Sequence, residues 1–341
     1  MSEQFLTPIP FGWFCIGYSD EIVIGEVKNI HYFDRDMVLF RTESGELGLT
    51  DPYCPHLGAH LGHGGEVVGE SIRCPFHHWA YDNKGFVTDV PYAKQIPPKA
   101  QGRSCLKTYR IVEKSQVIWA WYHPEEVEPF FDIIENPEVD DPNWVPLDRY
   151  LWTYNSTPQE IAENGVDVAH FKYIHLMDAV PEGESTYEGH IRRSMAEGPM
   201  MCPDGEGGEV PMSTRVDTVQ NGAGQKWSRL QGVIETLLLV LVTPINDHEV
   251  EMRFAFTHKR YDEDSVELQA CKDSIALTIG EENGLEADIV VWHNKKHLQQ
   301  PLLCDGDGPI MRYRKYFEQF YVGGPYGNAP ATLAAVKNAV G

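Results

Sequence analysis

The sequence contains no apolar run that is long enough to cross a bilayer as a helix. The longest aliphatic stretch extends only from Leu237 to Val242 and predicts a buried strand, whereas a spanning helix needs about 20 apolar residues. The first residues of the chain have neither the basic start nor the apolar core of a secretory signal. We therefore expect a cytoplasmic protein without a transmembrane segment.

Basic residues are scarce. Lys and Arg together number 28, against 51 Asp and Glu, which gives a formal net charge of −23. No Lys/Arg-rich tract interrupts this acidic background, so the surface is expected to repel nucleic acid and anionic membranes. The composition argues against nucleic-acid binding.

Cysteines are few, and most are scattered without the spacing of a disulfide framework. The total of seven is odd, which together with the scatter predicts reduced thiols. Five of them belong to no motif: Cys15, Cys105, Cys202, Cys271 and Cys304. The remaining two each stand next to a histidine.

These two cysteines open the most informative segments of the chain, Cys54-Pro55-His56 and Cys74-Pro75-Phe76-His77. Seventeen residues separate His56 from Cys74, and turn-forming residues surround both segments. One thiolate and one imidazole from each of two loops suit a [2Fe–2S] cluster in which cysteines hold one iron and histidines the other. The alternative is a structural zinc site, which accepts the same four ligands, although zinc motifs usually group the cysteines together.

The 341 residues, of which 42% are hydrophobic and 23% charged, suffice for two globular domains. Up to about residue 125 the pattern predicts short strands separated by turns, hence a small antiparallel β-sandwich. Five prolines among acidic residues then mark a surface linker between His123 and Pro146. We place the domains at residues 1–142 and 143–341.

The second domain combines strand patterns with helices, which predicts an α+β fold on a central antiparallel sheet. One helix is expected over Thr157–Tyr173, and two more over Ser265–Asn283, continuing to His297, and over Ile310–Tyr321. The expected strands are Arg149–Tyr154, Gly189–Met195, Lys226–Leu230, Val233–Thr243 and Glu249–His258.

A second constellation lies within the first of these helices and reads Asn164, Asp167, His170 and His175. Asp167 and His170 are three residues apart and so share a helix face, but His170 and His175 are five apart and would diverge on an ideal helix. They can converge on one metal only if the helix ends or is distorted near Tyr173. Two histidines with a carboxylate form the facial triad of non-heme iron enzymes; the alternative is two ordinary half-buried histidines.

With both motifs in this order, the chain resembles the terminal oxygenase component of a Rieske non-heme iron oxygenase. The opening Pro10–Phe14 and the closing stretch Pro301–Tyr321 agree. The closing stretch is similar to the 3-ketosteroid 9α-hydroxylase oxygenase branch and, more loosely, to the cholesterol 7-desaturase branch. The resemblance implies an all-β Rieske domain followed by a helix-grip-like α+β catalytic domain.

The resemblance also implies roles for particular residues. Cys54, His56, Cys74 and His77 would bind the [2Fe–2S] cluster. His170 and His175 would bind Fe(II) with a third, downstream carboxylate, for which Asp307 is the best match. Asp305 and Asp288 are the rivals, and Asp307 could instead favour the following helix by charge–dipole attraction.

Asp167 would bridge a cluster histidine of one subunit, His77 rather than His56, to His170 of the next in a homotrimer. A carboxylate can accept an N–H from each ring. Asn164 opens the same pattern, and we place it with Asp167 among the catalytic residues.

The implied activity is O2-dependent hydroxylation of a steroid-like molecule in steroid or lipid degradation, with electrons from NADH through a separate reductase. The chain has no GxGxxG fingerprint for a dinucleotide. Sterol 7-desaturation, aromatic-ring dioxygenation and electron transfer by a ferredoxin with an accessory domain are the alternatives. Side chains that could line an apolar cavity, or simply form core, are Met177, Trp227, Leu230, Val240 and Phe254.

Overall fold

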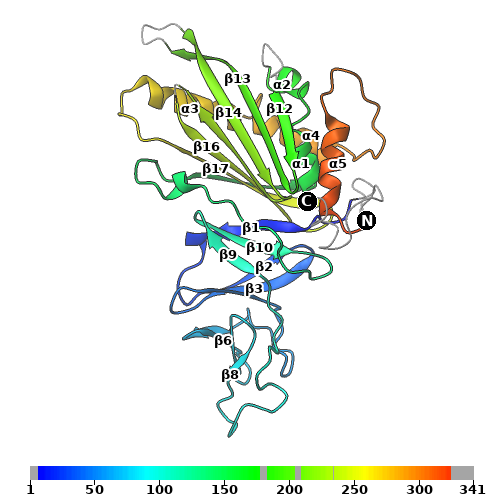
Figure 1. Ribbon diagram of the computed structural model, residues 1–341. Coiled ribbons are helices and arrows are strands. Elements are labelled where there is room, and N and C mark those ends of the chain that lie inside the picture. The colour runs from blue at the N-terminus through cyan, green and yellow to red at the C-terminus, as the bar shows by residue number, and fades with distance from the viewer. Residues whose placement is uncertain (1–6, 177–182, 204–208, 233, 324–341) are drawn as a thin grey trace. The chain divides into compact units, whose positions relative to one another are not determined.

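The computed structural model describes residues 7–176, 183–203, 209–232 and 234–323 (Figure 1). The described chain forms two compact units. The N-terminal unit consists of residues 15–122 and 126–129, and the C-terminal unit of residues 7–14, 123–125 and 130–323. Residues 130–142, which the sequence assigned to the linker of the first domain, therefore belong with the second unit.

The N-terminal unit is built from small antiparallel sheets. Strands β1 (Gly12–Tyr18), β10 (Val117–Tyr122) and β9 (Ile111–Lys114) form one sheet, and β2 (Val27–Tyr32), β3 (Arg35–Arg41) and β4 (Leu47–Thr50) form another. The third sheet has the order β5-β6-β7-β8, with the bounds Glu66–Val68, Ser71–Arg73, Ala80–Asp82 and Val87–Asp89. The predicted all-β first domain is confirmed by this arrangement.

The C-terminal unit is organised around a seven-stranded antiparallel sheet of order β11-β17-β16-β15-β14-β13-β12 (Figure 1). The strands in this order are Asp148–Asn155, Glu249–His258, Thr236–Pro244, Gln225–Gln231, Glu209–Asn221, Ile191–Pro203 and Gly183–Glu188. The helices are α1 (Pro158–Glu163), α2 (His170–Tyr173), α3 (Val266–Ile279), α4 (Leu285–Asn294) and α5 (Ile310–Phe317). The α+β class with a central antiparallel sheet is confirmed.

One face of this sheet packs against helices. Val240, Phe254 and Trp152 on the sheet share a hydrophobic core with Ile161 of α1 and Trp292 of α4. Opposing residues of antiparallel strands project to the same side of a sheet, and Val240 pairs with Phe254, which explains why both meet the helices.

The other face is contacted by the proline-rich segment. The Asn221 side chain donates to the Asp132 carbonyl at 2.9 Å, and the Gln225 amide donates to the Ile134 carbonyl at 2.8 Å. The segment predicted as a linker is thus held against the sheet by buried amide side chains.

Two helices expected from the sequence are each broken in two. The first ends at Glu163 and restarts at His170, and the second ends at Ile279 and restarts at Leu285. Gly280 and Gly284 allow the second break, because a Cβ at Gly284 would lie only 2.4 Å from the Gly280 nitrogen. No helix in the described ranges has the length and apolarity that crossing a bilayer requires.

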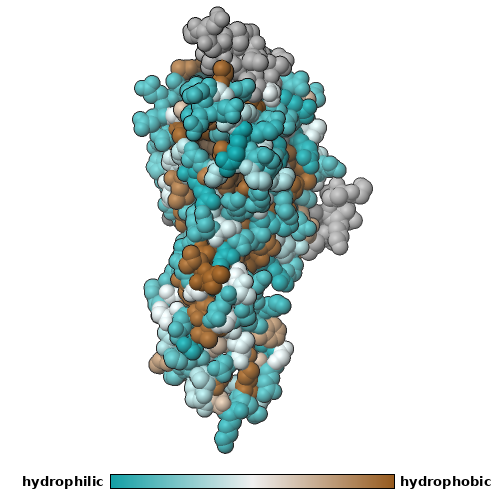
Figure 2. Space-filling view, turned by 90° about the vertical axis from the view of Figure 1, so that its left-hand side faces the viewer, coloured by the Kyte–Doolittle hydropathy of each residue, from teal (hydrophilic) through white to brown (hydrophobic). Residues whose placement is uncertain are grey.

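The visible surface is mostly hydrophilic, with smaller hydrophobic areas between (Figure 2), in keeping with the net charge of −23. The cysteines whose side chains are described are all free thiols, as the scattered spacing predicted: Cys15, Cys54, Cys74, Cys105, Cys271 and Cys304.

Candidate metal centres

Two loops of matching backbone geometry present the four Rieske-motif side chains. The Cys54 N–H donates to the Ala59 carbonyl at 2.8 Å, and the Cys74 N–H donates to the Trp79 carbonyl at 2.9 Å, five residues along in each case. Each cysteine carbonyl in turn accepts from the residue four positions on. The two loops are therefore conformational equivalents that carry one cysteine each.

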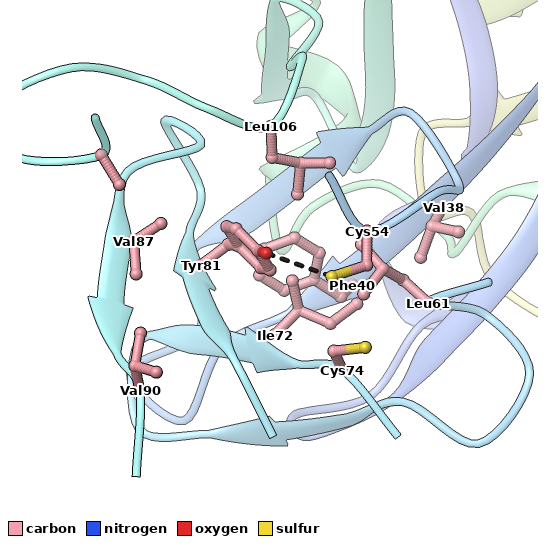
Figure 3. Close-up of a cluster of buried hydrophobic side chains, with 11 residues drawn as sticks. Val38, Phe40, Cys54, Leu61, Ile72, Cys74, Tyr81, Val87, Val90 and Leu106 are labelled. Carbon is pink, nitrogen blue, oxygen red and sulfur yellow. Dashed lines mark hydrogen bonds between the residues drawn. The ribbon is translucent and has the colours of Figure 1, made fainter. Parts of the chain in front are cut away.

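The cysteines lie at the inner side of these loops. Cys54 and Cys74 are each 2% exposed and belong to a hydrophobic core with Ile72, Leu61 and Tyr81 (Figure 3). The Tyr81 hydroxyl lies 3.1 Å from Cys54 Sγ. Burial raises the pKa of the Cys54 thiol, and this hydrogen bond partly opposes the rise. A thiolate here therefore depends on a neighbouring positive charge, which a bound iron supplies.

The two histidine rings lie next to each other. The rings of His56 and His77 have centroids 4.9 Å apart, and Trp79 stacks on His56 at 4.6 Å with an interplanar angle of 11°. The His77 Nδ1 atom is buried without a hydrogen-bond partner among the described residues. Buried polar atoms are rarely left unpaired, so this nitrogen fits a metal ligand.

The pairing of ligands favours a two-iron cluster over a zinc ion. Each loop supplies one cysteine and one histidine, whereas zinc motifs usually group the cysteines together. This pairing fits a cluster in which cysteines hold one iron and histidines the other. Across the described residues, the one set of three or more His, Cys, Asp or Glu donors that lie within 4.8 Å of one another is found elsewhere.

That compact set is His170, His175 and Asp288, in the C-terminal unit. The break between α1 and α2 places His170 at the first position of α2, and His175 follows the helix end at Tyr173. The two imidazole centroids are consequently 5.1 Å apart. The geometric requirement stated from the sequence, a helix that ends or is distorted near Tyr173, is met.

Backbone carbonyls fix the orientation of both rings. His170 Nδ1 donates to the Asp167 carbonyl, and His175 Nδ1 donates to the Asn283 carbonyl at 2.8 Å. Both Nε2 atoms are left facing the site, with His175 Nε2 at 3.2 Å from Asp288 Oδ2. Held in this way, a histidine presents one unprotonated nitrogen to a metal.

Asn164 connects the set. Its Nδ2 lies 3.1 Å from His170 Nε2 and 3.2 Å from Asp288 Oδ2. Burial lowers the pKa of His170, whereas the contact with Asp288 raises the pKa of His175. Two imidazoles and a carboxylate within bonding range of one point match the 2-His-1-carboxylate triad of non-heme iron.

Asp307, which the resemblance implied as the iron carboxylate, does not lie in this compact set. Asp307 Oδ2 instead accepts from the Cys304 backbone N–H at 2.6 Å, and neither Asp307 nor the exposed Asp305 belongs to the compact set. Asp288, on α4 and 5% exposed, takes this place. The resemblance favoured Asp307 over Asp288 because the family's carboxylate comes just before the last helix.

The structure also places Asp167 and the apolar side chains that could line a cavity. Asp167 is half-buried and contributes its backbone carbonyl to His170. Trp227, Val240 and Phe254 are core residues at 2%, 8% and 3% exposure, Leu230 is half-buried, and Met177 lies outside the described residues. The alternative that these apolar residues are core is therefore the better description of the three buried ones.

Comparison with known proteins agrees with this geometry. Residues 12–110 match the Rieske [2Fe-2S] domain, and residues 120–321 match the 3-ketosteroid 9alpha-hydroxylase C-terminal domain. The chain is 30% identical to a probable 3-ketosteroid-9-alpha-monooxygenase, oxygenase component, of Rhodococcus rhodochrous, over 91% of this chain and 79% of that protein. It is also 30% identical to cholesterol 7-desaturase of Caenorhabditis elegans, over 92% of this chain and 77% of that protein.

Solved structures share the fold at lower identity. Dicamba monooxygenase with non-heme iron and dicamba aligns with a TM-score of 0.69 at 16% identity, over 91% of this chain and 96% of that one. The NdmA QL mutant of Pseudomonas putida CBB5 with caffeine aligns with a TM-score of 0.68 at 18% identity, over 90% and 89%. The chain belongs to the Rieske oxygenases with a 3-ketosteroid 9α-hydroxylase-type C-terminal domain, enzymes whose oxygenase components use a [2Fe–2S] cluster and a non-heme iron.

Proposed function

We propose that this oxygenase component hydroxylates a steroid- or sterol-like molecule with O2, using electrons that a separate NADH-dependent reductase delivers. The observation that supports it most is the convergence of His170, His175 and Asp288 within 4.8 Å. A facial triad leaves open positions on the metal, which a monooxygenase needs and an electron carrier does not.

The residues present fit both inorganic groups. Cys54, Cys74, His56 and His77 would hold the cluster, and the unpaired, buried Nδ1 of His77 is the clearest sign of it. His170, His175 and Asp288 would hold Fe(II). When bound, the two groups supply electron storage and O2 activation.

The protein contributes orientation around the iron ligands. The Asp167 and Asn283 carbonyls hold the Nδ1–H of the two histidines, which keeps both Nε2 atoms unprotonated toward the metal. Asn164 donates toward His170 and Asp288. We assign Asn164 the role of keeping the side chains of His170 and Asp288 at a fixed distance from each other when substrate and O2 enter and leave.

The steroid assignment is supported by the relatives and by the sheet. The Rhodococcus relatives are named for 3-ketosteroids and the nematode relative for cholesterol. The sheet face toward the helices carries the half-buried Leu230 and Leu238 beside the buried core, and apolar side chains of this kind line sites for polycyclic molecules. Desaturation of a sterol is the second candidate, because the sequence identity to cholesterol 7-desaturase is 30%, the same as to the 3-ketosteroid monooxygenase components.

Electron delivery involves two further proteins or subunits. The sequence lacks a dinucleotide fingerprint, so NADH and flavin binding belong to the reductase. Within a homotrimer, we assign Asp167 the bridge from His77 of one subunit to His170 of the next. Asp167 is half-buried, and its backbone carbonyl already orients the His170 ring.

The test is turnover of the holoenzyme with a Rieske-oxygenase reductase and NADH. 3-Ketosteroids, sterols and aromatic substrates would be incubated under 18O2 and the products identified by mass spectrometry. We expect one labelled oxygen atom in a steroid product. An unlabelled product with a new double bond would favour desaturation, and a doubly labelled cis-diol from an aromatic substrate would overturn the proposal.

A further inference from the structure

A lysine stands on the sheet face beneath the iron ligands without a partner. Lys226 of β15 pairs with Val240 of β16, so its side chain projects to the side that packs against α1 and α4. It is half-buried, and it makes no hydrogen bond or ion pair with any residue that the structure describes. A charged group in such a place is costly unless something binds it.

The ammonium lies directly behind the turn that carries Asn164. Gly165 has no side chain, and the point where its Cβ would stand is 3.4 Å from Lys226 Nζ and 3.6 Å from Arg192 Nη1. The two cations therefore face the same glycine, one residue from Asn164. Lys226 also interacts electrostatically with Asp288, the carboxylate that Asn164 contacts.

Of the two cations, Arg192 makes hydrogen bonds within the protein. Arg192 is 2% exposed, and its Nη2 donates to the Gly165 carbonyl and to the Ser185 hydroxyl, both at 3.0 Å. Arg192 therefore holds the turn in place. Gln220, opposite Lys226, is likewise occupied by Tyr313 and by the Gly222 carbonyl. Lys226 is left as the donor available to a bound molecule.

Charge explains what Lys226 would bind. Burial and the repulsion of Arg192 lower the pKa of Lys226 to about 8, while Asp288 counteracts them. Asp288 would be engaged by Fe(II), which adds positive charge nearby. The site then has an excess of positive charge that an oxygen acceptor can offset.

The surroundings of the stem are apolar. A small cavity of about 10 Å³ between α1 and the sheet is lined by Lys226 together with Pro158, Ile161, Ala162, Val240 and Val242, among others. It has room for about one water molecule. The flexible side chain of Lys226 can adjust the position of its ammonium to a ligand.

Building on the proposed function, we propose that Lys226 is a specificity-determining residue that binds a carbonyl or carboxylate oxygen of the substrate. The substrate class is an apolar molecule with an oxygen acceptor near the carbon that is attacked. An analogue without this oxygen leaves the ammonium unpaired and is rejected for that reason.

The test is a binding cycle on the anaerobic holoenzyme. Three ligands share one steroid nucleus and carry a ketone, a carboxylate or hydrogen at the same position. Naphthoate and naphthalene form a second, non-steroid pair. The proteins are the wild type, Lys226→Met, Lys226→Arg and the control Lys272→Met, which removes an exposed lysine of α3.

We expect Lys226→Met to raise the Kd of the oxygen-bearing ligands about tenfold or more, while the Kd of the hydrogen analogue changes less than about threefold. Lys226→Arg should retain part of the preference, and Lys272→Met all of it. The ketone and carboxylate arms tell which oxygen is recognised. Mononuclear iron content should stay at the wild-type level in every variant.

Three results would overturn the inference. Equal weakening of oxygen-bearing and oxygen-free ligands would make Lys226 a packing residue, and loss of iron from Lys226→Met would make it a support for Asp288. Failure of every ligand to bind would reject the substrate class. If no steroid binds but Lys226→Met weakens naphthoate more than naphthalene, the role of Lys226 in binding oxygen is supported and the steroid assignment is rejected.

Discussion

Glu163 and Arg314 form a buried, two-pronged ion pair that joins α1 to α5. Arg314 Nε and Nη2 donate to the two Glu163 carboxylate oxygens at 2.7 and 2.8 Å, and both side chains are under 10% exposed. Glu163 directly precedes Asn164, so the pair anchors the end of the helix from which the iron site begins.

Breaking this pair should be severely destabilising. Arg314→Met leaves an uncompensated carboxylate in the interior, so we expect a loss of about 3–5 kcal/mol in the free energy of unfolding. Urea titration measures this quantity. The control is Arg110→Met, which removes the exposed partner of Glu128 and should cost under about 1 kcal/mol. Equal costs for both variants would contradict the assigned role of the pair.

Asp288 and Asp307 should differ sharply in metal content. Asp288→Asn removes a ligand, so the purified protein should retain the cluster but lose the mononuclear iron, going from about three irons per subunit to about two. Asp307→Asn is the matched control and should keep about three. Iron and sulfide assays with paramagnetic resonance distinguish the centres. The reverse pattern would restore Asp307 as the ligand.

Asp167→Asn should uncouple the two centres. If the carboxylate bridges histidines of neighbouring subunits, the amide cannot accept from both rings, and turnover should fall to near zero while both metals stay bound. Single-turnover transfer from the reduced cluster, followed by its absorbance, is the measurement. Near-normal transfer in this variant would show that Asp167 is a solvated loop residue.

Protonation of Glu160 at low pH should lower the free energy of unfolding. Burial raises its pKa, but the contacts with His297 and with Lys295 Nζ, at 2.5 Å, prevail and lower it to about 2. The folded pKa lies below the unfolded one, so this stabilisation is fully present above about pH 4.5 and is lost as pH falls toward 2.

The measurement is the free energy of unfolding between pH 6 and pH 3, with wild type and Glu160→Gln compared. Between pH 6 and pH 3 the wild type should lose on the order of 2 kcal/mol more than the variant. Parallel pH profiles for the two proteins would mean that Glu160 does not contribute to acid sensitivity.

Gly58 and His78 occupy equivalent positions in the two cluster loops, each four residues after its cysteine. Both have left-handed backbone, with φ of 77° and 59°. A Cβ at Gly58 would meet nothing within 4 Å, so Gly58→Ala should cost about 1 kcal/mol through backbone strain alone. His78→Gly should be tolerated, whereas His78→Val should cost more than Gly58→Ala because β-branched residues resist this conformation.

Loss of cluster absorbance during denaturant titration reports these changes. Equal stability of Gly58→Ala and the wild type would mean that the loop can adopt another backbone conformation.

The cluster site could be predicted from the sequence because its information is local. All four motif residues lie between Cys54 and His77, and the turn-forming residues around them indicate that each cysteine–histidine pair is carried by a loop. The proximity of His170 and His175 could be predicted for the same reason. Even the break in their helix followed from the spacing of His170 and His175, because one metal cannot bind both on a regular helix.

The carboxylate could not be predicted in this way. Asp288 lies more than a hundred residues from His175, and its position depends on a helix break at Gly280 and Gly284 that hydrophobic periodicity does not reveal. Asp307 had the better motif match but the wrong place in space. Lys226 gave no signal either, since a lysine within a strand pattern is expected to face solvent.

The break between α3 and α4 has a mechanical consequence. Asn283, whose carbonyl orients His175, and Asp288, which faces the same imidazole, are carried by one short covalent segment. Any displacement of this segment moves the orienting carbonyl and the carboxylate together. The ring orientation of His175 and its carboxylate neighbour are therefore mechanically linked, and a change in the α3–α4 connection would alter both at once.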